Sequence, residues 1–215
     1  MHGRAAAAAL LLATAGSAAA HPHGRLGCQV QLGLEGGRLG WVTQRLTLDA
    51  ASSAALAERL QIGAAEPVPQ PVALFRDLVL GLFRHSGWML DLRAEGAAEA
   101  VALDDSAAAW HRLDDGRLVL SLRLAPKAPV PAAAQWAIAC RDPVWYWVAE
   151  YTAPDAVSAS GATCTATLDG PRDAAAEAAA LSAAARAAGA MGAEQVAASA
   201  TSAAQLGAGR ARLRC

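Results

Sequence analysis

The chain of 215 residues has few charged residues, few aromatic residues other than tryptophan, and no excess of charge of either sign. Charged residues make up 17% of the chain, and 18 Lys and Arg nearly balance 19 Asp and Glu. A nucleic-acid-binding protein normally carries a basic excess, so the balance argues against this class. After the first twenty residues no segment is apolar over the roughly 20 residues that a membrane-spanning helix needs. The sequence therefore predicts that the mature chain is not inserted into a membrane.

Familiar catalytic and phosphate-binding motifs are also missing. The chain has no G-x-S-x-G nucleophile turn, no H-E-x-x-H zinc motif and no glycine-rich phosphate loop. It has no C-x-x-C pair either, which leaves a zinc ribbon or a thioredoxin-like redox motif without support. We therefore do not expect an enzyme.

The N-terminus has the features of a secretory signal peptide. Arg4 is followed by an apolar run over 5–14 and then by small residues up to Ala20. Cleavage after Ala20 would remove a signal peptide of residues 1–20 and leave one periplasmic domain, 21–215. A low-complexity alanine-rich start is the alternative.

All four cysteines, Cys28, Cys140, Cys164 and Cys215, follow the predicted cleavage site. In an oxidising compartment paired cysteines form disulfides, and four cysteines allow three connectivities. We favour Cys28–Cys140, which would join two predicted strands, and Cys164–Cys215, which would tie down the otherwise loose C-terminal residue. Reduced cysteines buried as small apolar residues are the alternative.

Alternation of apolar and polar residues predicts a chain rich in β-strands. Segments 26–34 and 39–48 flank a glycine-containing turn and form a hairpin. Segments 107–113 and 117–124 flank Asp114-Asp115-Gly116 and form a second one. Further strands are predicted at 88–93, 100–103, 135–140, 144–151 and 163–168.

A helical insert is predicted at about 49–87. Asp49 is a candidate N-cap for a helix over 50–61, and a proline-rich loop follows. The segment 72–85 is typical of an amphipathic helix, with apolar residues spaced by four at Leu74, Leu78 and Leu82 and beside them at Phe75, Val79 and Phe83.

The C-terminal part differs from the rest in its alanine content. Pro171 opens a predicted alanine-rich helix that runs to about residue 188, and the segment of about 189–209 is weakly patterned. The expected fold class is α+β: a mostly antiparallel β-sheet or sandwich with an inserted helical pair and an Ala-rich C-terminal helix.

The most specific candidate for chemistry is the start of the mature chain, His21-Pro22-His23. An N-terminal histidine offers its α-amine and its ring nitrogen to a metal ion, and His23 could add a third nitrogen. Pro22 has no backbone N–H, so a site built on successive deprotonated amides is blocked. Zinc, nickel, copper or cobalt would suit such ligands. A terminus that binds nothing is an equally open alternative.

Two other residues could complete this metal site. Asp142 lies in a break between two predicted strands, and His111 lies next to Trp110 in another. An aspartate that only caps a turn, and an exposed histidine, are the ordinary alternatives. His85 is expected to close the amphipathic helix, where its charge suits the helix dipole.

The order of several short motifs resembles a bacterial family, domain of unknown function 1007, which is often described as an uncharacterised ABC-type transport system periplasmic component. The matching pieces are the signal peptide leading into His21-Pro22-His23, then Gly36-Gly37-Arg38-Leu39, Leu46-Thr47-Leu48-Asp49, Asp114-Asp115-Gly116-Arg117-Leu118, Arg141-Asp142-Pro143-Val144-Trp145-Tyr146, Cys164-Thr165-Ala166-Thr167 and the terminal Cys215.

The resemblance implies a periplasmic role in handling transition metals. The chain departs from the family pattern after His23, where Gly24-Arg25-Leu26-Gly27 replaces the usual aliphatic residue, Trp, Ile and Asp. It also has a proline-rich stretch, 63–71, where many members carry an acidic, calcium-loop-like one, so no calcium site is expected.

Three functions compete on this basis. The first is an exported periplasmic accessory protein that binds or handles a divalent transition metal for a cation transporter of the inner membrane. The second is a cell-envelope structural or interaction module without metal, with tryptophan-rich strands as its contact surface. The third, a copper oxygenase, is disfavoured because no second, well-spaced histidine ligand is evident.

Overall fold

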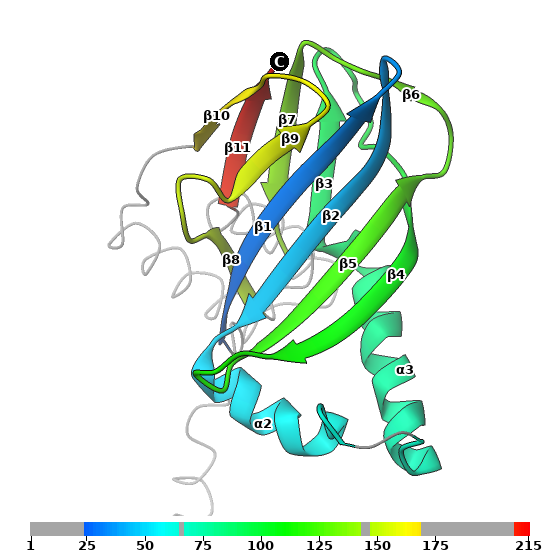
Figure 1. Ribbon diagram of the computed structural model, residues 1–215, viewed down its shortest axis with the longest axis vertical. Helices are drawn as coiled ribbons and strands as arrows, with labels where there is room; N and C mark the ends of the chain where they lie inside the picture. The colour runs from blue at the N-terminus through cyan, green and yellow to red at the C-terminus, as the bar shows by residue number, and fades with distance from the viewer. Residues whose placement is uncertain (1–23, 65–66, 143–146, 169–208) are drawn as a thin grey trace, which may run out of the picture.

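The computed structural model describes residues 24–64, 67–142, 147–168 and 209–215, which form two β-sheets and two α-helices (Figure 1). The strands of the larger, seven-stranded sheet are β1 (Gly24–Glu35), β2 (Arg38–Leu48), β4 (Leu103–Arg112), β5 (Leu118–Pro126), β6 (Val130–Pro131), β8 (Trp147–Tyr151) and β9 (Val157–Ser160). Its strand order is β4-β5-β2-β1-β8, with β6 paired to β2 and β9 paired to β1.

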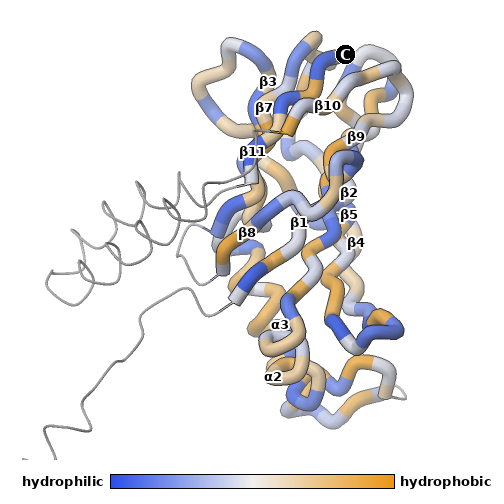
Figure 2. The backbone as a smooth tube through the Cα atoms, turned by 90° about the vertical axis from the view of Figure 1, so that its left-hand side faces the viewer, coloured by the Kyte–Doolittle hydropathy of each residue, from blue (hydrophilic) through white to orange (hydrophobic). Residues whose placement is uncertain are grey.

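A smaller, four-stranded sheet packs against the larger one. It consists of β3 (Leu90–Ala94), β7 (Gln135–Cys140), β10 (Thr165–Leu168) and β11 (Gly209–Arg214), in the order β10-β11-β7-β3. Hydrophobic and hydrophilic residues alternate along many of the strands (Figure 2), so that each sheet turns one apolar face inward. The inward residues of both sheets form one core, which includes the fully buried Leu26, Leu46, Leu120, Trp136 and Leu213.

Two disulfides connect these strands with the connectivity that the sequence analysis favours. Cys28 on β1 is bonded to Cys140 on β7, which joins the two sheets through the core. Cys164, directly before β10, is bonded to Cys215, directly after β11. The C-terminus is therefore held both by this bond and by the pairing of β11 with both of its neighbours.

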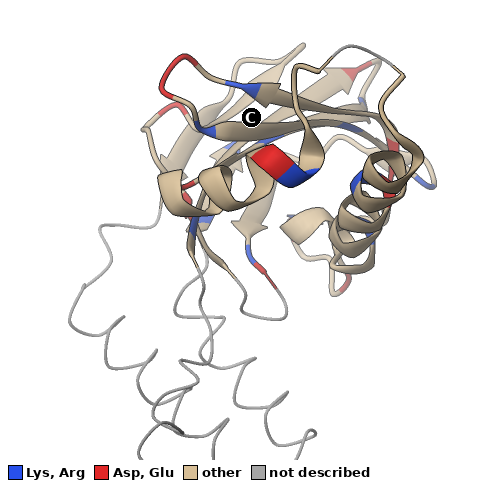
Figure 3. Cartoon of the chain, turned by 90° about the horizontal axis from the view of Figure 1, so that it is seen from below, with Lys and Arg blue, Asp and Glu red and all other residues tan. Residues whose placement is uncertain are grey.

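The helical pair lies between β2 and β3, as the sequence predicts. It consists of α2 (Ala50–Leu60) and α3 (Gln70–His85), and a short 3-10 turn, η1 (Gly87–Met89), leads into β3. Both helices lie at one end of the sheets (Figure 1). Seen from that end, acidic and basic residues are few and of both signs (Figure 3). Neither helix of the described part of the chain is long and apolar enough to cross a membrane.

The sequence of α3 contains two apolar stripes, and only one of them packs against the sheets. Val79 and Phe83 are 7% and 2% exposed, whereas Leu74, Leu78 and Leu82 are 60%, 60% and 62% exposed. Both stripes repeat every four residues, so spacing alone does not decide which one faces the core. The stripe of Val79 and Phe83 packs inward, where Phe83 stacks on Trp147 and meets Trp110 in a T-shaped contact.

The expected α+β class is confirmed, and its details are corrected in several places. The larger sheet is mixed, because β1 pairs in parallel with β8 and with β9. The predicted Ala-rich C-terminal helix lies outside the described residues. No strand forms over 100–102, and the strands β6, β9 and β11 were not predicted.

The strand expected to begin at Trp88 begins only at Leu90. Gly87, Trp88 and Met89 have positive φ angles of 63°, 60° and 55°, which is left-handed backbone that non-glycine residues rarely adopt. Trp88 and Met89 are nevertheless 3% and 4% exposed, so burial of their large side chains holds this turn in place.

Candidate functional site

The start of β1 is the place where the chain passes from the predicted metal-binding histidines into the sheet. Gly24, its first residue, directly follows His23 in the sequence and pairs in parallel with Trp147, the first residue of β8. Since one residue spans at most about 3.6 Å, side chains around this pair are the ones within reach of His21 and His23. His21 and His23 themselves lie outside the described residues.

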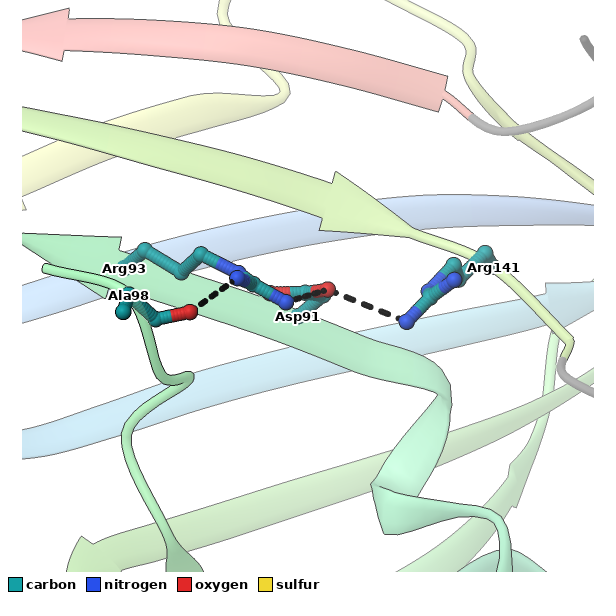
Figure 4. Close-up of polar contacts among 4 residues, drawn as sticks. All are labelled: Asp91, Arg93, Ala98 and Arg141. Atoms are coloured by element: carbon teal, nitrogen blue, oxygen red, sulfur yellow. Dashed lines mark hydrogen bonds and ion pairs between the residues drawn. The ribbon is translucent and has the colours of Figure 1, made fainter. Parts of the chain in front are cut away.

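Asp142 is the first carboxylate beside this pair. It is 3% exposed, and its Oδ2 accepts a hydrogen bond from the backbone N–H of Trp147 at 3.0 Å. The neighbouring Arg141 is fixed as well, because its guanidinium donates to Asp91 at 3.1 Å (Figure 4) and its N–H donates to the carbonyl of Met89. Asp142 therefore caps the start of β8, and its buried carboxylate lies one strand away from Gly24.

Asp49 is the second carboxylate, and it contacts β1 directly. Its Oδ2 accepts from the N–H of Arg25 at 2.5 Å, and its Oδ1 accepts from the N–H of Ser52 at 2.7 Å, which confirms Asp49 as the N-cap of α2. Burial raises the pKa of Asp49, but the hydrogen bonds from Ser52 and Arg25 outweigh burial and hold it below its usual value. A Cβ on Gly24 would overlap Asp49 Oδ2 and Ser52 Oγ, so a larger residue here would have to displace these two side chains.

His111 does not join these carboxylates. It is exposed on β4, which stands at the opposite end of the strand order from β8. Its side chain also points to the face opposite that of Trp110, which contacts Phe83. His85 is exposed in the last turn of α3, where the sequence analysis expects it.

The described residues alone do not make a metal site. They contain no group of three or more His, Cys, Asp or Glu side chains that could hold an ion. Asp49 and Asp142 do place carboxylate groups beside the start of β1. Nitrogen ligands, which zinc, nickel and copper favour, would have to come from His21 and His23. The residues around Gly24 thus fit a transition metal only in combination with the two histidines.

The tryptophans do not form an exposed contact surface in the described part of the chain. Trp136 and Trp88 are buried, and Trp41, Trp110 and Trp147 are half-buried. Trp147 is stacked on Phe83 with their ring centroids 5.8 Å apart. Trp88, Trp110, Trp136 and Trp147 belong to the core or pack against it. Trp41 lies outside the core, where the Arg123 guanidinium covers its ring and its N–H donates to Glu35. The described tryptophans therefore do not gather on one exposed face.

One polar cluster was not anticipated from the sequence. Asp91 on β3 accepts hydrogen bonds from Arg93 at 2.7 and 3.1 Å and from Arg141 at 3.1 Å (Figure 4). The hydrogen bond from Arg93 lowers the pKa of Asp91 despite its burial. The pattern Asp91-Leu92-Arg93 indicates such an ion pair, because it places an acid and a base on the same face of a strand.

A family model described as "Protein of unknown function (DUF1007)" matches residues 6–215, which is nearly the whole chain. A search of curated proteins finds no match. The extent of the family match shows that this chain belongs to the DUF1007 family.

Proposed function

We propose that this protein is an exported periplasmic accessory protein that binds a divalent transition metal for a cation transporter of the inner membrane. The position of Gly24 is the observation that carries the proposal. The strand that follows His21-Pro22-His23 begins beside two carboxylates, Asp49 and Asp142, from distant parts of the sequence. A binding segment attached there would meet fixed oxygen ligands as soon as it reached the sheet.

Each residue has a defined part in this proposal. After cleavage His21 supplies its α-amine and its imidazole, and His23 supplies a second imidazole. Asp142 supplies a carboxylate oxygen, since its capping hydrogen bond to Trp147 holds the group in place. The ion is cargo, and its binding displaces protons from the amine and the imidazoles. The affinity should therefore rise with pH across the imidazole range, near pH 6.5.

Export rests on separate support. The N-terminal segment has the composition of a signal peptide, and both disulfides are compatible with an oxidising compartment.

The test is a calorimetric titration of zinc, nickel and copper into the processed protein that begins at His21. Three variants are compared with it: one with an additional N-terminal Gly, a His21→Ala/His23→Ala double variant, and Asp142→Asn, which keeps an acceptor for the Trp147 N–H. All three should bind more weakly than the processed protein, and His111→Ala is the control that should not. Equal affinity in all five proteins would contradict the proposal.

The second candidate is a cell-envelope interaction module without metal. The exposed stripe of Leu74, Leu78 and Leu82 on α3 favours it, because contiguous exposed apolar side chains often mark interaction sites. Absence of metal binding in the titration would make this candidate the leading one.

A further inference from the structure

The outer face of the four-stranded sheet has an arrangement of charge that the metal proposal does not use. Along β11 the buried Gly209, Ala211 and Leu213 alternate with exposed arginines, which are Arg210, Arg212 and Arg214. Three arginines at every second residue of one strand point to the same side of the sheet. They form a row of positive charge along the middle of this face, because β11 lies between β10 and β7.

The strand next to this row, β7, turns two alanines outward, and Gln135 lies opposite Arg214. Ala137 and Ala139 on β7 lie opposite Arg212 and Arg210, and both point outward because their neighbours Trp136 and Ile138 are buried. Beyond the alanines, β3 places Arg93 and Asp91 in the same two cross-strand rows. The two alanines thus form a strip between the arginines of β11 and the charged side chains of β3. The strands β11 and β3 are two strand spacings apart, which is about 10 Å.

The charge on this face is not balanced by its carboxylates. Asp91 is shared between Arg93 and Arg141, both of which it already binds (Figure 4). Arg212 has no ion pair or hydrogen bond with any residue that the structure describes, and Arg214 reaches only the side-chain oxygen of Gln135, at 3.5 Å. Among the described residues, the other acidic groups near this face are at its rim, at Glu95 after the end of β3 and at the carboxylate of Cys215. The chain as a whole is close to neutral, so this excess is local.

We infer that the arginine face, defined by Arg212 and Arg214 with the alanine strip of Ala137 and Ala139, binds an extended acidic segment of a partner protein. Alternate residues of a strand are about 6.7 Å apart. A partner segment in extended conformation with a carboxylate at every second residue has the same repeat, so successive carboxylates meet successive guanidinium groups. Arg binds carboxylate with two parallel hydrogen bonds, which favours this pairing over a general attraction.

The alanine strip explains how such a segment approaches. Because Ala137 and Ala139 end at Cβ, a peptide backbone can lie over them while its acidic side chains turn toward β11. The anionic groups of a membrane surface have no fixed repeat, and their binding does not require a strip of short side chains. The observations therefore favour a peptide. The inference does not depend on the metal site, because no residue of the arginine face is a proposed ligand.

The test is fluorescence anisotropy with a labelled heptapeptide in which Glu alternates with Thr, in low-salt buffer with chelator. An isomer with its three Glu in a row is the control peptide. The protein variants are Arg212→Gln/Arg214→Gln and the matched control Arg38→Gln/Arg45→Gln, which removes two exposed arginines from β2 of the other sheet. The alternating peptide should bind the unmodified protein best, and added salt should weaken it. The Arg212→Gln/Arg214→Gln variant should bind about tenfold more weakly, and the control variant should bind unchanged.

Several outcomes would overturn the inference. Equal binding of the two peptides, or equal losses in the two double variants, would mean that only overall charge matters. Binding to vesicles that contain phosphatidylglycerol, without binding to the peptide, would identify the face as a membrane contact. Lack of peptide binding together with a lower thermal midpoint of Arg212→Gln/Arg214→Gln would mean that another part of this chain covers the arginines.

Discussion

Cys28 and Cys140 are bonded to each other in the centre of the core, where both residues are 0% exposed. The bond joins β1 of the larger sheet to β7 of the smaller one. The other disulfide has a different environment, because Cys215 is exposed and Cys164 is half-buried at the edge of the fold. Thiol–disulfide exchange requires the attacking thiolate to reach a sulfur atom, so the two bonds should differ in how they respond to a reductant.

We predict that dithiothreitol reduces only Cys164–Cys215 in the folded protein. Iodoacetamide labelling followed by peptide mass mapping should then find label at these two cysteines, and at all four when urea is added with the reductant. Without reductant, unfolded protein should take up no label, because the described cysteines are all paired. Label at Cys28 or Cys140 in the folded, reduced protein would contradict their burial, and label without reductant would reveal a free thiol.

A buried glutamine next to the core disulfide leads to a second prediction. Gln44 is 0% exposed, and its Nε2 lies 3.8 and 3.9 Å from the sulfur atoms of Cys28 and Cys140, which are weak acceptors. Its Oε1 has no hydrogen-bond partner among the described residues. A buried acceptor without a partner costs about 1–3 kcal/mol.

Replacing this side chain with an apolar one of similar length should therefore stabilise the fold. Gln44→Met is expected to raise the free energy of unfolding by about 1 kcal/mol, measured by urea denaturation. The control is Gln29→Met, at an exposed position of β1, where no gain is expected. A destabilised Gln44→Met variant would show that the amide makes a necessary contact.

The third prediction concerns Asp49, which caps α2 and binds the N–H of Arg25. Loss of an N-cap typically costs about 1 kcal/mol, so Asp49→Ala, which also removes the acceptor for the Arg25 N–H, should lower the free energy of unfolding by at least about 1 kcal/mol at pH 7. The control is Asp114→Ala in the exposed turn before β5, which should leave this free energy unchanged.

The pH dependence follows from the lowered pKa of Asp49 in the folded state. Folding favours the charged form of Asp49. Its contribution to the free energy of unfolding is therefore complete above its pKa in the unfolded chain, about 3.9, and is lost as the pH falls through its lower pKa in the folded protein. The difference between the unmodified protein and Asp49→Ala should accordingly shrink below about pH 4. A difference that stayed constant down to pH 2 would mean that the charge of Asp49 does not contribute.

The sequence predicts the elements that repeat regularly and are close together in the chain. The hairpin of β1 and β2 is visible in the alternation of Cys28, Val30 and Leu32, and Asp49 is recognisable as a cap because its role is local. β9 is not visible, since Val157–Ser160 consists mostly of small residues and becomes a strand only by pairing with β1. The left-handed turn at Trp88 is likewise a result of burial.

The candidate site could be predicted only in part for the same reason. Asp142 was recognised as a capping residue or a ligand, but its position one strand from Gly24 depends on the parallel pairing of β1 with β8, which are far apart in the sequence. His111 shares only its residue type with the other candidate ligands, because it is exposed on β4 on the face opposite Trp110. The pairing of distant strands decides the position of Asp142, and no local pattern encodes it.

The last prediction distinguishes the two apolar stripes of α3. Phe83 is 2% exposed between Trp147 and Trp110, whereas the adjacent Leu82 is 62% exposed. Phe83→Ala should lower the free energy of unfolding by about 3–5 kcal/mol, because it removes buried surface and leaves a cavity between two indoles. Leu82→Ala should change it by less than about 0.5 kcal/mol, and alanine keeps the helix propensity high. Both variants are compared by urea denaturation, with the near-UV circular dichroism of the tryptophans as a second signal. A large loss for Leu82→Ala would mean that the leucine stripe is covered in solution, and a small loss for Phe83→Ala would contradict the packing of α3 against the two sheet tryptophans.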